Sequence, residues 1–181
     1  MPLIQLLLQQ SVPIHLADDA GLTPLHYAAK FGFAELTLAL LERDAPIEAK
    51  SKAKETPLHV ATIPDATAVI SHLVQYGANL NAVQHDEETP LMYAAQRDCC
   101  SAIALLVKHG ASLTRQDSRK NTALHHAASF GHHASAHLLV RHGIDISIRN
   151  DSGDTALDIA ISKGHTWVAD FLKKEADEST F

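Results

Sequence analysis

Apolar and polar positions follow a pattern that returns every 33 residues along this chain of 181 residues. In the first complete unit, Leu25, Ala28 and Ala29 stand at the three- and four-residue spacing of one helix face. Leu36 and Leu40 repeat this spacing after a short polar break. Each unit therefore predicts two short amphipathic helices joined by a turn.

The first helix of each unit begins with the same phrase. Thr23 is a good helix cap, and Pro24 suits the first helical position, where no amide proton is needed. Gly32 is expected to end this helix because glycine adopts the left-handed conformation at little cost. The phrase starts at Thr23, Thr56, Thr89, Thr122 and Thr155. A fixed period of this length is typical of a stacked array whose units bury their apolar faces against their neighbours.

The period, together with the phrase Thr-Pro-Leu-His-Tyr-Ala-Ala that begins at Thr23, resembles the ankyrin repeat. The resemblance covers nearly the whole chain. It implies an all-α solenoid of helix-turn-helix units, in which the loops between units form projecting β-hairpin fingers. In this register, residues 1–17 form an N-terminal half-repeat that holds a second helix only. The full repeats are 18–50, 51–83, 84–116, 117–149 and the C-terminal cap 150–174, followed by a polar tail at 175–181.

The fingers differ from one another at one turn position. The family prefers glycine two residues before the Thr, and the chain keeps Gly21 and Gly153 there. Lys54, Glu87 and Lys120 occupy this position in the three central fingers. If the turn still requires a left-handed residue, each of them costs about 1 kcal/mol. Otherwise these fingers adopt a different turn, and the sequence leaves both alternatives open.

Charge and composition narrow the classes of function. A formal net charge of -6 disfavours nonspecific nucleic-acid binding, which needs a basic surface. The apolar start at residues 1–8 is far shorter than a membrane span and lacks the basic flank of a signal peptide, so we expect no membrane insertion. Cys99 and Cys100 are adjacent and cannot frame a disulfide scaffold, which fits a reducing compartment. We therefore expect a cytoplasmic or nuclear location.

The chain holds 13 histidines, which raises the question of a metal site. His26, His59 and His125 belong to the repeated phrase, where the imidazole tethers the local backbone. His133 and His137 are one helical turn apart and could bind a metal as a pair. Zinc needs three or four ligands, however, and no third ligand of matching register is evident. We predict no metal site and no cofactor.

Catalytic motifs are not recognisable in the sequence. No Ser or Cys lies in a nucleophile motif, no glycine-rich phosphate loop is present, and no pair of carboxylates stands out from the repeat. We therefore predict that the chain is not an enzyme.

The resemblance implies a binding surface on the concave face, formed by the finger tips and the exposed ends of the first helices. Phe31, Arg97 and Phe130 carry the most weight, because aromatic and Arg residues dominate interface energetics. In a plainer interpretation each Phe packs against the neighbouring repeat. The residues predicted to bind a protein or peptide partner are Lys30, Phe31, Lys52, Ile63, His85, Asp86, Glu88, Arg97, Arg119, Asn121 and Phe130.

The fingers alternate in charge along the array. Finger two is basic, finger three is acidic and finger four is basic, through Lys50, Lys52 and Lys54, then Asp86, Glu87 and Glu88, then Arg115, Arg119 and Lys120. Such stripes suit a partner of complementary charge. They also suit pairing between neighbouring fingers, each exposed pair being worth little. We favour pairing between the fingers.

Two short motifs lie apart from the repeated phrase. Residues 73–81 resemble the segment in which ankyrin asparagines are hydroxylated, which makes Asn81 a candidate modification site, with Asn79 in place of the usual acid. The final Glu-Ser-Thr-Phe resembles a carboxylate ligand for PDZ domains, with Ser179 and Phe181 at the positions that are read.

The predicted function is a protein-interaction module, such as a scaffold or adaptor, that binds its partner on the concave face. One alternative is a stoichiometric inhibitor of a kinase or transcription factor. Another is a targeting module cut from a larger ankyrin-containing enzyme, channel or secreted effector. The half-repeat favours this last alternative, because no first helix precedes it to cover Leu3, Leu6 and Leu7.

Overall fold

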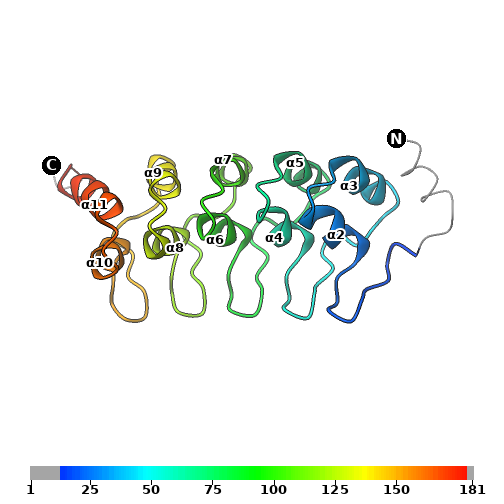
Figure 1. The fold of residues 1–181 in the computed structure, drawn as a ribbon, viewed down its shortest axis with the longest axis horizontal. Coiled ribbons are helices and arrows are strands. Elements are labelled where there is room, and N and C mark those ends of the chain that lie inside the picture. The colour runs from blue at the N-terminus through cyan, green and yellow to red at the C-terminus, as the bar shows by residue number, and fades with distance from the viewer. Residues whose placement is uncertain (1–12, 179–181) are drawn as a thin grey trace.

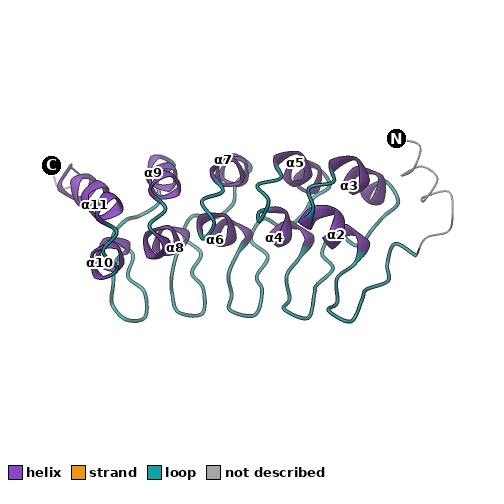
Figure 2. Cartoon of the chain, in the orientation of Figure 1, coloured by secondary structure: helices purple, strands orange, loops and turns teal. Residues whose placement is uncertain are grey.

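The computed structural model describes residues 13–178, which form two rows of helices with loops projecting along one edge (Figure 1). The first helices of the repeats are α2 (Pro24–Lys30), α4 (Pro57–Ala61), α6 (Pro90–Ala95), α8 (Ala123–Phe130) and α10 (Ala156–Ser162). The second helices are α3 (Ala34–Leu41), α5 (Thr67–Gln75), α7 (Cys100–Lys108), α9 (His133–Arg141) and α11 (Thr166–Glu178). These residues contain helices and loops but no strand (Figure 2), which confirms the predicted all-α solenoid.

Some sequence predictions fall at the ends of the chain. Residues 1–12 of the predicted half-repeat lie outside the described residues, as do Ser179 and Phe181 of the predicted PDZ ligand. At the other end, α11 continues to Glu178, so the helix extends into the segment 175–181 that the sequence predicts as a polar tail.

Each first helix begins at the Thr of the repeated phrase. All five threonines have the extended backbone of a helix cap, and the side chain three residues later bonds back to the Thr amide. In repeat 2, for example, the Thr56 N–H donates to Nδ1 of His59 at 3.2 Å. This arrangement pairs amide groups that a helix start otherwise leaves unsatisfied. The threonines thus fix where each repeat starts.

The core is one ribbon of apolar side chains that runs from Leu25 in α2 to Leu172 in α11. First helices pack on first helices and second helices on second helices, as α2 does on α4 and α3 on α5. The small side chains of Ala28 and Ala29, both fully buried, allow this close approach. Each repeat therefore completes its core only by contact with its neighbours.

Within residues 13–178 the fingers contain no strand, so the β-hairpin detail of the expected fold is not confirmed. At the tip of finger two, Ser51 N–H donates to the Glu55 carbonyl at 2.9 Å, and Lys54 N–H donates to the Ser51 carbonyl at 2.8 Å. These bonds close a tight turn, but the residues on either side form no continuing ladder, so no strand results.

All five finger turns use a left-handed residue, which settles the alternative left open by the sequence. Lys54, Glu87 and Lys120 have φ values of 62°, 61° and 60°, close to the 78° and 83° of Gly21 and Gly153. The central fingers therefore keep the same turn and carry its conformational strain.

Candidate functional site

The fingers stand side by side because the backbone of each one bonds to the next. Lys52 N–H donates to the Ala20 carbonyl at 2.8 Å, and Ser118 N–H donates to the Asp86 carbonyl at 2.8 Å. Finger five joins finger four in the same way, through Asp151 N–H and the Arg119 carbonyl at 3.0 Å. The resulting row of fingers lies below the row of first helices in Figure 1.

Two adjoining hollows lie between the third and fourth fingers and the first helices; we call them the groove. The first, of about 250 Å³, is lined by Asp86, Glu88, Asp117, Ser118, Arg119, Asn121 and His126. The second, of about 350 Å³, is lined by Glu88, Gln96, Arg119, Asn121, His125, His126, Ser129, Phe130 and Ile159. The groove brings together five of the predicted partner-binding residues: Asp86, Glu88, Arg119, Asn121 and Phe130.

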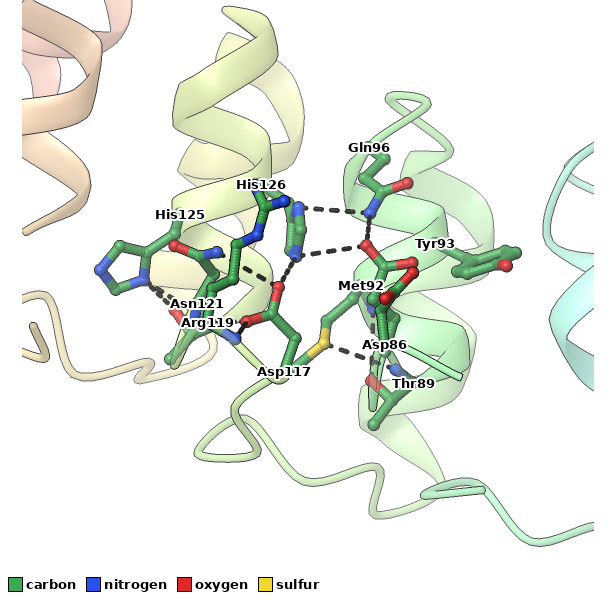
Figure 3. Close-up of polar contacts among 12 residues, drawn as sticks. Asp86, Thr89, Met92, Tyr93, Gln96, Asp117, Arg119, Asn121, His125 and His126 are labelled. Atoms are coloured by element: carbon green, nitrogen blue, oxygen red, sulfur yellow. Dashed lines mark hydrogen bonds and ion pairs between the residues drawn. The ribbon is translucent and has the colours of Figure 1, made fainter. Parts of the chain in front are cut away.

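His126 lies at the centre of the groove, between two carboxylates (Figure 3). Its Nε2 is 3.0 Å from Asp117 Oδ2 in finger four and 3.7 Å from Glu88 Oε1 in finger three. Its Nδ1 lies 3.2 Å from the Gln96 amide nitrogen, and the same amide donates to Glu88 Oε1. His126 and Glu88 are half-buried and Asp117 is buried. The four side chains therefore form one polar network that links repeats 3 and 4.

Asp117 holds its place in this network through the turn of finger four. Its Oδ1 accepts hydrogen bonds from the Arg119 and Asn121 amides at 2.9 and 2.8 Å. Burial acts to raise the pKa of this carboxyl, but the bonds from His126, Asn121 and Arg119 outweigh burial and hold the pKa at about 2. Asp117 therefore carries a negative charge across the physiological pH range.

The predicted aromatic contacts are exposed. Phe31 and Phe130 have 58% and 55% of their surface open to solvent. Phe31 stacks with Tyr27 and Phe33 of its own repeat, and Phe130 stacks on His132 at 5.9 Å between ring centroids. Both rings are therefore more than half open to solvent, and the ring stacking of each is to side chains of its own repeat.

The remaining predicted residues lie along the array outside the two hollows. Arg97 is exposed, with its guanidinium 5.0 Å from the centroid of the Tyr93 ring. Lys30, Lys52 and Ile63 are exposed as well. His85 is also exposed, and its Nε2 is 2.9 Å from the Lys52 carbonyl. Asn81, the candidate modification site, is half-buried and accepts a hydrogen bond from Ser112 N–H of the next repeat at 2.8 Å.

Pairing between the charged fingers, which the sequence favoured, is wrong. Within residues 13–178, no ion pair joins the lysines of finger two to the acids of finger three, or those acids to the basic residues of finger four. The fingers meet through backbone groups, and an exposed ion pair gains too little to order two long side chains. The finger charges are therefore available to a partner.

Five histidines join neighbouring repeats. His26, His59 and His125 tether the start of their own helix, as predicted, and their Nε2 atoms also reach a carbonyl of the next finger at 3.0 to 3.1 Å. His132 and His165 reach back to carbonyls of the preceding repeat at 3.0 and 3.1 Å. These side chains belong to the framework, although His125 also lines the second hollow of the groove.

Sequence reasoning missed Asp117, His126 and Gln96. The sequence does hold a signal for the contact between Glu88 and His126, which is their separation of 38 residues. One repeat earlier, Glu55 and Tyr93 have the same separation, and Tyr93 Oη donates to Glu55 Oε1 at 2.9 Å. A carboxylate 38 residues before a polar side chain in the first helix therefore indicates a contact between two repeats.

Three larger hollows lie toward the ends of the array, and none of the predicted residues lines them. One, of about 430 Å³, lies along Phe33, Ala34, Glu35 and Leu36. The second, of about 410 Å³, lies beside α10 and α11, and the third, of about 420 Å³, lies between the end of α9 and α11. The groove is therefore the hollow region on which the predicted residues converge.

None of the helices in residues 13–178 has the length and apolar character to cross a membrane.

The fold and the groove together define a helical repeat protein with a polar groove along its fingers. The family model for ankyrin repeats (3 copies) matches the chain over residues 1–84, 45–117 and 91–180. The chain therefore belongs to the ankyrin repeat family. A search of curated proteins returned no match. Ankyrin repeats generally act as protein–protein interaction modules, and the family is typically not enzymatic.

Proposed function

We propose that the chain binds a protein or peptide partner in the groove between its fingers and first helices and catalyses no reaction of its own. The observation that carries the proposal is the meeting of five predicted contact residues around two adjoining hollows. They come from two neighbouring fingers and one first helix, so an extended partner segment can contact all of them at once. The coarse function follows from the family, and the shared lining of the two hollows supports a location in the groove.

The surface of the groove suits recognition by contact. Phe130 is more than half exposed beside the charged hollows, and a partner that covers it removes a large apolar ring from water. Because the finger charges have no partners in neighbouring fingers, they can pair with a partner of complementary charge. Burial of the ring supplies affinity, and the charges supply specificity and orientation.

The hydrogen bonds of His126 favour binding over catalysis. Its contacts in the described part of the chain are Asp117, Glu88 and Gln96, none of which is a hydroxyl or thiol nucleophile. A nucleophilic site needs such a group within hydrogen-bond reach of the base. The two cysteines lie elsewhere, and burial raises the pKa of both thiols, which disfavours the reactive thiolate.

A binding measurement with matched variants tests the proposal. A partner is first isolated with the tagged chain and purified, and its affinity is then measured by calorimetry. The groove variant combines Arg119→Ala with Phe130→Ala, which both line the groove, and the control variant combines Lys108→Ala with Arg141→Ala at the exposed ends of α7 and α9. We expect the groove variant to bind at least about ten-fold more weakly and the control to match the wild type. Loss in the control alone would place the interface on the second helices.

A further inference from the structure

The groove contains three metal-ligating side chains that come from three separate elements. Glu88 belongs to finger three, Asp117 to finger four and His126 to α8, and one ligand atom of each lies within 4.8 Å of the others. His126 Nε2 is 3.0 Å from Asp117 Oδ2 and 3.7 Å from Glu88 Oε1. An ion with bonds of about 2.0–2.1 Å in tetrahedral geometry holds its ligands about 3.4 Å apart. The three atoms need only small shifts to share one ion.

The charges at this position are not balanced by the protein. The side chains of Glu88 and Asp117 are 17% and 6% exposed, and both face the same imidazole. No Lys or Arg in residues 13–178 forms an ion pair with either carboxylate, although Arg119 lines the same hollow. Two carboxylates therefore face at most one positive imidazolium. Sheltered charges of this kind are normally paired or bound to a cation.

Both carboxylates are held by other groups in positions that present an oxygen to the site. Asp117 Oδ1 is fixed by two finger amides, which leaves Oδ2 directed at His126. Glu88 Oε2 accepts a hydrogen bond from Gln84 Nε2 at 2.7 Å, while Oε1 lies 3.7 Å from His126 Nε2 and accepts a hydrogen bond from the Gln96 amide, which the ion would replace. Hydrogen bonds that orient the ligating carboxylates are a regular feature of metal sites.

The cluster is not a requirement of the repeat, because the neighbouring interfaces lack it. The positions of Glu88, Asp117 and His126 correspond to Glu55, Gln84 and Tyr93 one repeat earlier, and to Asn121, Asn150 and Ile159 one repeat later. The earlier interface offers one carboxylate and the later one none. The repeat folds with other residues at these positions, so the three ligands at one interface call for a separate explanation.

We propose that Glu88, Asp117 and His126 bind a divalent transition-metal ion, with Zn²⁺ as the best-suited ion. One imidazole and two carboxylates match the ligand types of Zn²⁺, and a fourth coordination position faces the hollow, where water or a partner side chain can enter. With the ion on Nε2, the imidazole proton lies on Nδ1. The Gln96 amide then turns its oxygen toward Nδ1 to accept this proton.

Two substitutions remove ligands while keeping contacts that the chain already uses. Asp117→Asn preserves the turn, because Asn150 makes the same pair of bonds to the Ser152 and Asp154 amides in finger five. His126→Tyr preserves a hydrogen bond to the finger acid, because Tyr27 Oη donates to Asp18 Oδ2 at 2.6 Å in repeat 1. Before any metal is added, circular dichroism is used to check that each variant is folded.

The test is calorimetric titration of the metal-free protein with Zn²⁺ alone, with amide NMR spectra to locate the ion. The control variant combines His133→Asn with His137→Asn, which removes the surface pair whose rings are 6.2 Å apart. We expect one site in the wild type and in the control, and at least ten-fold weaker binding in Asp117→Asn and His126→Tyr. The amide signals of Arg119 and Asn121 should shift when Zn²⁺ binds.

Three results would overturn the proposal. The first is an absence of Zn²⁺ binding in the wild type. The second is equal affinity in the wild type and both ligand variants. The third is loss of binding in the His133→Asn, His137→Asn control, which would place the ion on α9. None of these results bears on partner binding, which the variant with Arg119→Ala and Phe130→Ala tests separately.

Discussion

Replacing His59 with Met should make the protein less sensitive to acid. His59 is completely buried in α4, where Nδ1 accepts from the Thr56 amide and Nε2 lies 3.1 Å from the Glu88 carbonyl. When the imidazole is protonated, the second ring proton lies on Nδ1, which can then no longer accept the hydrogen bond from the Thr56 amide. Repeat 3 already carries Met92 at the equivalent position, with its sulfur 3.4 Å from the Thr89 amide, so the repeat accommodates the substitution.

The size of the effect follows from the shift in the pKa of His59. Burial lowers this pKa from 6.5 to about 4, and the Glu88 carbonyl and the charge of Glu55 oppose burial without overcoming it. Below pH 6.5 the unfolded chain therefore binds a proton that the folded protein refuses. Stability from this residue is complete above pH 6.5 and falls until pH 4. The loss is about 2 kcal/mol at pH 5 and about 3.4 kcal/mol below pH 4.

Urea unfolding, followed by far-ultraviolet circular dichroism at pH 7.5 and pH 5, measures this loss. The quantity to compare is the change in the free energy of unfolding between the two pH values, because His59→Met also loses hydrogen bonds at neutral pH. We expect this change to be about 2 kcal/mol smaller in His59→Met than in the wild type. The control is His109→Met, since His109 is exposed at the end of α7.

An equal change in the wild type and in His59→Met would refute the reasoning. His26 and His125 remain in the variant, and burial lowers the pKa of both, so some acid sensitivity must persist. A loss that disappears entirely would also contradict the argument, because it assigns to one histidine an effect that three share. A change in the denaturant slope would point to the unfolded state rather than to the titration of His59.

Three further substitutions test the framework, each by urea unfolding at neutral pH. Gly131→Ala should destabilise the protein by at least about 1 kcal/mol more than Gly143→Ala. Both glycines are left-handed, but only a Cβ at Gly131 would lie 2.7 Å from His165 Nδ1. Equal losses would exclude this clash. Lys120→Gly should stabilise by about 0.5–1 kcal/mol because φ is 60° there, whereas Lys173→Gly inside α11 should destabilise by about 1 kcal/mol; a loss in Lys120→Gly would mean that the turn is unstrained. Asp98→Ala should lower the free energy of unfolding by about 1–2 kcal/mol, because Asp98 Oδ1 in repeat 3 accepts from Ser135 N–H in repeat 4 at 3.0 Å. Asp98→Asn keeps an accepting oxygen and should recover most of this loss.

The framework could be predicted from the sequence because it rests on local rules applied once per repeat. A Thr cap, a helix-ending turn and an apolar face are each set by residues within a few positions of one another, and the period gives five chances to recognise them. The two first helices that lack a helix-ending glycine follow the same local rule. Asp65 and Asp98 stand at the glycine position and have positive φ values of 52° and 55°, respectively. Aspartate tolerates this conformation better than most residues.

The binding surface could be predicted only in part. Exposure of Phe31 and Phe130 followed from register, but the pairing of charges did not, because long side chains at a finger tip can reach several neighbours or none. The position of His126 between Glu88 and Asp117 depends on side-chain directions across two repeats. A period describes what the repeats share, whereas this contact depends on how they differ.

This difference indicates where function lies in the molecule. The first residue of every finger accepts from finger amides whether it is Asp18, Ser51, Gln84, Asp117 or Asn150, so the turn tolerates several side chains. The first-helix position that His126 occupies in repeat 4 varies much more, as Tyr27, Val60, Tyr93, His126 and Ile159 in the five repeats. Val60 and Tyr93 are buried at this position, whereas Tyr27 is exposed and His126 is half-buried, so the framework leaves the freedom for one repeat interface to differ from the next. The only interface in residues 13–178 that gathers three metal-ligating groups arises from this freedom, and it lies where the predicted partner contacts converge.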